Sequence, residues 1–178
     1  MPIKGIQSLI CHAFSERNIE MIESKQQKRA VGSKAARQPA QEAEASLYYT
    51  IDGKPGFPAL GFRQAMISAC RYVDDLPMTV ARGAFFVDGD LIPLRCSEPY
   101  LHRSRVVLNR KTTSIAYRAC YEEWEADLSI SYQENVITVE QIINILELAG
   151  FAVGVGAWRP ACKGQFGRFE IKKGAVAE

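Results

Sequence analysis

Short runs of alternating or continuous apolar residues along the chain predict a series of strands. The clearest alternation lies in residues 124–132, where every second side chain is apolar and falls on one face, the period of a strand. Other strand-like runs are shorter or less regular, and they lie at residues 3–14, 47–51, 83–89, 91–94, 106–108, 151–155 and 167–171. The sequence therefore predicts many short strands separated by turns.

Two segments have helical periodicity instead. The first begins after Pro58 and carries apolar residues at helical spacing as far as Val73, before an Asp-Asp-Leu-Pro run ends it. The second begins at Thr138, which with Gln141 three residues later forms a capping-box pattern. Its apolar stripe leads to Gly150, which we expect to end the helix.

The order of these segments is strand, loop, helix, several strands, helix and strand. This order predicts an α+β fold with a βαββαβ core of the ferredoxin-like or RRM type, carrying loop insertions. Two helices on one face of an antiparallel sheet would bury both apolar stripes and leave the other face available for a ligand. We expect residues 1–178 to form a single domain.

The segment 24–46 differs from the rest because Val31 is its only sizeable aliphatic residue. Such a composition cannot bury enough surface to offset the entropy of ordering. Positive charges come first in this segment and acidic residues follow. Two interpretations stay open: a flexible loop or surface helix in water, or a basic arm that becomes ordered on a polyanion.

The amino-acid composition limits the class of protein but does not indicate a function. The chain has 178 residues, of which 47% are hydrophobic and 24% charged, and its net charge is +2. These values are normal for a globular protein, and any basic patch must be local. Five cysteines without zinc-ligand or CxxC spacing predict reduced thiols, most of them buried. We expect a cytoplasmic protein, since neither a signal peptide nor a membrane-spanning stretch is evident. We also expect no metal and no cofactor.

The strongest local signal is the glycine-rich segment 153–169. Its glycines, which we expect to let the backbone approach a phosphate, are Gly154, Gly156, Gly164 and Gly167. Basic residues in the segment can neutralise phosphates and aromatic residues can stack on bases. The candidate ligand contacts are Trp158, Arg159, Lys163, Phe166 and Arg168. An ordinary hairpin whose aromatic residues enter the core is the competing interpretation.

Two further segments carry basic residues beside turns. In residues 53–63, a Gly/Pro-rich turn leads into the first helix, whose N-terminus can attract an anion. The candidate residues there are Lys54, Phe57 and Arg63. In residues 105–118, basic and hydroxyl residues precede the alternating strand, with Arg110, Lys111 and Arg118 as candidates. Each segment alone is also typical of an ordinary loop.

Together, in this order, the three segments resemble the motifs of the RAMP (repeat-associated mysterious protein) superfamily, particularly the subunits that coat guide RNA in CRISPR effector complexes. The sequence departs from the family pattern at Gln165, which is an extra residue, at Gly61-Phe62-Arg63 and at Asn109. The resemblance implies an RRM-like core, single-stranded or guide RNA as the ligand, and side-by-side oligomers. The chain also resembles standalone proteins of tailed phages, which implies a bacterial cell and a gene carried by phage.

We therefore expect a non-catalytic protein that binds single-stranded nucleic acid, RNA before DNA. Other possibilities stay open: a metal-independent endoribonuclease of RAMP type, a phage-encoded inhibitor or mimic of a CRISPR backbone, and a single-stranded DNA-binding protein of phage recombination. Only His12 and His102 are available for imidazole chemistry. We interpret His102 as a surface residue in a basic loop and His12 as a residue of the first strand.

Overall fold

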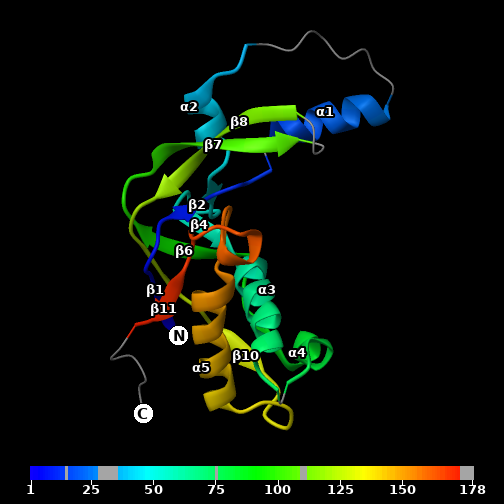
Figure 1. The fold of residues 1–178 in the computed structure, drawn as a ribbon, viewed down its shortest axis with the longest axis vertical. Helices are drawn as coiled ribbons and strands as arrows, with labels where there is room; N and C mark the ends of the chain where they lie inside the picture. Colours follow the sequence, from blue (N-terminus) through cyan, green and yellow to red (C-terminus); the bar gives the residue numbers. More distant parts are fainter. Residues whose placement is uncertain (15, 28–35, 75, 109–111, 173–178) are drawn as a thin grey trace.

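The computed structural model describes residues 1–14, 16–27, 36–74, 76–108 and 112–172. It has a mixed α+β architecture with antiparallel sheets, as the sequence predicts (Figure 1). The largest sheet has six strands, and each neighbouring pair is antiparallel. In spatial order they are β11 (Phe169–Ile171), β1 (Pro2–Gly5), β9 (Trp124–Asp127), β6 (Leu91–Cys96), β4 (Pro55–Pro58) and β3 (Tyr48–Tyr49).

Two helices, α3 (Ala59–Ala69) and α5 (Val139–Leu148), lie side by side against this sheet (Figure 1). The capping box of α5 is confirmed: the Thr138 hydroxyl accepts from the amide of Gln141, and the Gln141 side chain accepts from the amide of Thr138. Buried aromatic rings join the helices to the sheet. Phe62 of α3 lies 6.0 Å from the ring of Phe169 and contacts Trp124.

The other face of the sheet carries charge. Across four strands, the register aligns Glu170, Lys4, Glu125 and Arg95, so that negative and positive side chains alternate. We call these four residues the charge row. Arg95 also lies 2.6 Å from the carboxylate of Asp127. On the described strands β11, β1, β9 and β6 this face has no aromatic ring, so it offers a nucleic acid neither a stacking surface nor net positive charge.

A second, three-stranded sheet has the order β2 (Leu9–Ile10), β8 (Thr112–Tyr121) and β7 (Tyr100–Leu108). Strands β7 and β8 form a long hairpin that extends away from the large sheet (Figure 1). Helix α2 (Pro39–Glu44) packs against the hairpin, where Arg37 donates to the carbonyl of Ile115 and lies over the ring of Tyr117.

The remaining elements are a two-stranded sheet and short helices. They are β5 (Phe85–Val87), β10 (Ile130–Tyr132), α1 (Glu16–Gln26), α4 (Met78–Ala84) and the short turns Cys70–Tyr72, Ala149–Val153 and Pro160–Cys162. Helix α1 includes the start of the segment 24–46 and α2 covers Pro39–Glu44 near its end, so the described parts favour the surface-helix interpretation. The basic residues Lys28, Arg29 and Lys34 lie outside the described residues.

Several expected strands are different in the structure. The expected strand at 151–155 is wrong, because helix α5 continues through a wide turn at Ala149–Val153. Gly150 does not end the helix. It is a glycine because a Cβ there would lie 2.0 Å from the carbonyl oxygen of Phe169. Gly154, with φ of 69°, is the residue that turns the chain out of the helix.

Two other expected strands are each split between sheets. Residues 3–14 contain β1 and β2, and residues 124–132 contain β9 and β10, with each member of a pair in a different sheet. The alternation in 124–132 nevertheless predicts the buried side correctly at Trp124, Ala126 and Leu128. Helix α4 is not predicted by the sequence pattern.

The cysteine thiols are all unpaired. Cys11, Cys70 and Cys120 are buried, Cys96 is partly buried and Cys162 is exposed. Burial raises the pKa of Cys11 to about 12, so that thiol stays protonated and unreactive at neutral pH. Among the described residues, every helix is too short or too polar to cross a membrane.

Candidate nucleic-acid interface

The glycine-rich segment folds back over the three-stranded sheet. Its amides bond to β2 and its surroundings: Ala157 donates to the carbonyl of Ile10, and Gly167 donates to that of Ser8. The glycines permit this close fit. A Cβ at Gly164 would lie 1.7 Å from the carbonyl oxygen of Trp158, and one at Gly167 would lie 1.8 Å from that of Val155. These two glycines therefore serve the packing of the protein's own backbone.

Beneath this segment, the register of the small sheet brings three nitrogen-rich side chains into line. His102 of β7 pairs directly with Arg118 of β8. On the other side of β8, Ile10 pairs with Cys120 and the amide of Cys11 donates to the carbonyl of Ala119. Continuing that register places His12 beside Arg118. We call His12, Arg118 and His102 the histidine–arginine row, and directly opposed side chains of this kind have Cβ atoms roughly 4.5–5.5 Å apart.

Arg118 has no carboxylate partner among the described residues. Burial lowers the pKa of its guanidinium, and no neighbouring acid offsets that effect. The pKa values of His12 and His102 are also lowered, first by burial and then by the positive charge of Arg118. The row thus holds a permanent cation between two imidazoles that are neutral at pH 7, and an anion beside it would be stabilised.

Polar atoms next to the row also lack partners. Nδ1 of His102 and Oγ of Ser104, two residues along the same face of β7, are buried without a hydrogen bond. An unsatisfied buried polar atom costs roughly 1–3 kcal/mol, so such a pair calls for an explanation. The ring of Phe166 meets that of His102 edge-on, with 5.3 Å between ring centroids. An aromatic face, two free polar atoms and a cation therefore lie together.

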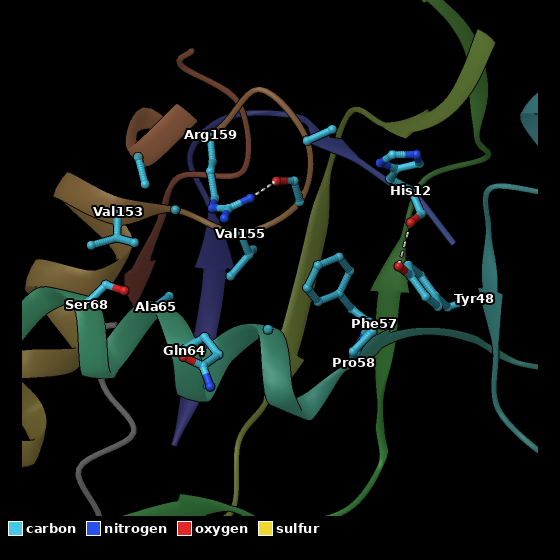
Figure 2. Close-up of a pocket in the computed structure, with 15 residues that line it drawn as sticks. His12, Tyr48, Phe57, Pro58, Gln64, Ala65, Ser68, Val153, Val155 and Arg159 are labelled. Carbon is cyan, nitrogen blue, oxygen red and sulfur yellow. Dashed lines mark hydrogen bonds between the residues drawn. The ribbon is translucent and has the colours of Figure 1, made fainter. Parts of the chain in front are cut away.

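A cavity of about 320 Å³ opens between the glycine-rich segment and α3 (Figure 2). Its walls come from β4 and α3 on one side, from residues 153–157 with Arg159 on another, and from His12 and Tyr48. Figure 2 shows Arg159 extending from the glycine-rich segment, with its guanidinium donating to the carbonyl of Gly156 at 2.9 Å. The hydroxyl of Tyr48 donates to the carbonyl of His12 and fixes that side of the cavity.

The other candidates in the glycine-rich segment do not line the cavity. Trp158 and Lys163 have positive φ angles of 55° and 64°, and both are exposed. Arg168 lies over the ring of Phe151, with its Nε buried and unpaired. Like Arg159, neither Lys163 nor Arg168 is bound to a carboxylate among the described residues. These cations remain available to a polyanion.

The candidates at the start of α3 are more dispersed. Phe57 is 5% exposed, but it lines the cavity. Lys54 is exposed in the turn between β3 and β4. Arg63 points to the opposite side of α3, where it donates to the carbonyls of Phe85 and Arg82 and is not part of the site. Arg110 and Lys111 lie outside the described residues.

Sequence reasoning did not identify Ser104, Tyr48 or the partnership of His102 with Arg118. The pairing of His102 with Arg118 could have been predicted. Both residues lie eight positions from residue 110, so a hairpin that turns at residue 110 places them opposite each other. Nothing in a linear pattern shows that Arg118 lacks an acidic partner. Among the described residues there is also no group of three or more His, Cys, Asp or Glu side chains that is arranged to hold a metal ion.

No model of a known protein family matches the chain, and no curated protein matches it significantly.

Proposed function

We propose that the protein binds a single strand of nucleic acid, RNA before DNA, on the surface formed by the hairpin β7–β8 and the glycine-rich segment. One observation carries the proposal: Arg118 is a partly buried cation without a carboxylate partner in the described chain. Removing a cation from water without a counter-ion is costly, and a bound phosphate offsets that cost.

The neighbouring groups fit a nucleotide strand better than a small free anion. Phe166 and the exposed Trp158 can stack on bases, and a stacked base contributes roughly 1–3 kcal/mol. His102 Nδ1 and Ser104 Oγ are buried in the free protein, so a ribose 2′-hydroxyl, which is both donor and acceptor, can pair with them only after the covering side chains move. This match is the reason to place RNA before DNA.

The architecture supports a relationship to the RAMP proteins. Four strands of the large sheet have the spatial order β11-β1-β9-β6. Along the chain they come in the order β1, β6, β9 and β11, with α3 between β1 and β6 and α5 between β9 and β11. This order and these helix positions support a ferredoxin-like βαββαβ core. We accordingly propose such a core, with β7 and β8 inserted between its second and third strands, and side-by-side assembly of protomers along the strand.

The proposal is tested by replacing Arg118 with methionine, which keeps much of the side-chain length and removes the charge. We expect affinity for a labelled 20-nucleotide RNA to fall about tenfold or more, and the salt dependence to weaken by roughly 0.7 in log–log slope for the lost phosphate contact. Fluorescence anisotropy at several salt concentrations measures both quantities.

The matched control is Arg95→Met, which removes an arginine from the charge row, where it is paired with acids. This variant should bind RNA like the unmodified protein. Equal losses in the two variants, or no RNA binding by the parent protein, would contradict the proposal. Tighter binding of the same sequence as DNA would assign the site to single-stranded DNA instead.

A second function, endoribonuclease activity, is favoured by the position of two imidazoles on either side of Arg118. In such a reaction one imidazole accepts the proton of the 2′-hydroxyl as its oxygen attacks the adjacent phosphorus. The other imidazole gives a proton to the departing 5′-oxygen, and Arg118 stabilises the charged phosphorane. A 2′,3′-cyclic phosphate is the product.

Incubation of labelled hairpin RNA with the parent protein, His12→Ala and His102→Ala tests this activity. Cleavage by the parent alone supports it, with a bell-shaped pH profile because one imidazole must be protonated and the other neutral. Intact RNA in every lane rules it out and leaves strand binding as the function.

A further inference from the structure

We infer that the cavity between α3 and the glycine-rich segment receives the base of one nucleotide, turned out of the bound strand, while its phosphate lies at the histidine–arginine row. This inference rests on the proposed strand binding and adds a defined pocket to it. Neutralisation of phosphates alone would not account for a cavity at this place.

The size of the cavity suits one nucleotide. Pockets that enclose small ligands have volumes of roughly 300–1,000 Å³. At about 320 Å³ this cavity lies at the lower limit, with room for one base and part of its sugar. A ring at the wall is held in place by close packing, because Phe57 lies against Gly61, where a Cβ would be 2.7 Å from its Cε1.

The lining suits a nucleobase. Phe57 and Tyr48 supply aromatic surface, and they meet edge-on with 5.7 Å between ring centroids. Around them are polar groups able to pair with base edges: the Gln64 amide, the Ser68 hydroxyl and the Arg159 guanidinium. Arg159 uses one of its five N–H donors on Gly156, so donors remain for a ligand. Figure 2 shows Gln64 and Ser68 on α3, across the cavity from Arg159.

The cavity and the row are connected through His12. His12 is one end of the row and also lines the cavity. A base in the cavity and a phosphate beside Arg118 therefore belong to neighbouring positions on one strand. Binding through both groups explains how a protein of low net charge can hold a nucleic acid, since base contacts add to the few phosphate contacts.

The test closes the cavity without touching the row. Ala161 is an exposed residue at the cavity wall, and Ala161→Trp places a large ring there. Affinity is measured by anisotropy for two labelled strands of equal length, a normal RNA and a strand with abasic sugars throughout. Ala40→Trp on α2, an exposed position that does not line the cavity, is the matched control.

We expect Ala161→Trp to bind the normal strand at least fivefold more weakly and the abasic strand as well as the parent does. Ala40→Trp should match the parent on both strands. If Ala161→Trp binds both strands with the affinity of the parent, or with an affinity lowered by the same factor for both, the pocket assignment is wrong and the proposed strand binding is unaffected. If the parent protein binds neither strand, both the pocket and the proposed function fail.

Discussion

At the scale of residues, the site combines groups that most folded proteins avoid leaving unpaired. Arg118 lacks an acid in the described chain, and His102 Nδ1, Ser104 Oγ and Arg168 Nε are buried without hydrogen bonds. Each such group lowers the stability of the free protein. A ligand anion that pairs with the partly exposed Arg118 recovers part of this free energy, so binding and stability are linked at this site.

This linkage predicts a pH dependence at His102. Its pKa in the folded protein lies below the ordinary 6.5, so the unfolded chain takes up the proton first as the pH falls. The contribution of His102 is therefore fully present above pH 6.5 and is lost as the pH falls below that value. We expect the melting temperature in phosphate-free buffer to fall less between pH 7.5 and 5.5 in His102→Gln than in the parent.

Strand binding should show the opposite trend. A phosphate at the row raises the pKa of both imidazoles, so affinity for RNA should increase as the pH falls from 7.5 to 5.5. Replacing both His12 and His102 with glutamine should leave a nearly flat profile in anisotropy titrations. Affinity that falls on acidification in the parent protein would contradict a phosphate at this row.

Residue chemistry was only partly predictable from sequence. Arg118, Arg159 and Phe166 were identified as candidates, and the structure places all three near the row or the cavity. Arg63 was an equally good candidate by composition, yet it bonds to backbone carbonyls on the other side of α3. Local sequence places Arg63 near the start of α3. It does not specify whether that side of the helix faces the cavity, because this depends on tertiary packing.

At the scale of elements, predictability follows how local the determining contacts are. Helix α5 is specified by its own capping box and apolar stripe, so its start is correct to the residue. The chain stays helical through Ala149–Val153, because Gly150 packs against the carbonyl of Phe169, about twenty positions later in the chain, and does not end the helix; there the sequence prediction is wrong. The expected strands 3–14 and 124–132 failed for the same reason, since partners from elsewhere in the chain decide where each run changes sheets.

The glycine-rich segment should tolerate no side chain at Gly164. A methyl group there meets the Trp158 backbone at 1.7 Å, and relieving such an overlap costs roughly 1–3 kcal/mol. We therefore expect Gly164→Ala to lower the free energy of unfolding by that amount and to weaken RNA binding. Gly83→Ala in α4 is the control. Apart from its chain neighbours and the backbone of its own helix, no atom lies within 4 Å of the added Cβ, so this variant should be neutral or stabilise the protein by up to about 1 kcal/mol.

Chemical denaturation of both variants measures these effects. A Gly164→Ala protein as stable as the parent would mean that the segment 154–168 is not folded against the sheet as described.

At the scale of the whole molecule, charge is distributed unequally. In the charge row, acids and bases alternate and compensate each other, whereas Arg118, Arg159, Lys163 and Arg168 have no acid partner among the described residues. A net charge of +2 therefore understates the attraction of one side of the protein for a polyanion. Bound protomers should all present the same side to the strand.

This orientation predicts a regular stoichiometry on long strands. If protomers bind side by side, the number bound should rise in equal steps as the RNA is lengthened from 12 to 24 to 48 nucleotides, and Arg118→Met should reduce occupancy at every length. Mass photometry of the complexes counts protomers directly. A single protomer on every length of strand would exclude side-by-side assembly.

The two ends of the described chain meet at the site. The amides of Ile6 and Gln7 donate to the carbonyl of Arg168, and the amide of Gly167 donates to that of Ser8. On the ribosome the N-terminal half of a chain emerges first, and contacts so distant in sequence form last. A nascent chain therefore lacks the complete proposed surface until residues 167 and 168 have emerged and folded against residues 6–8.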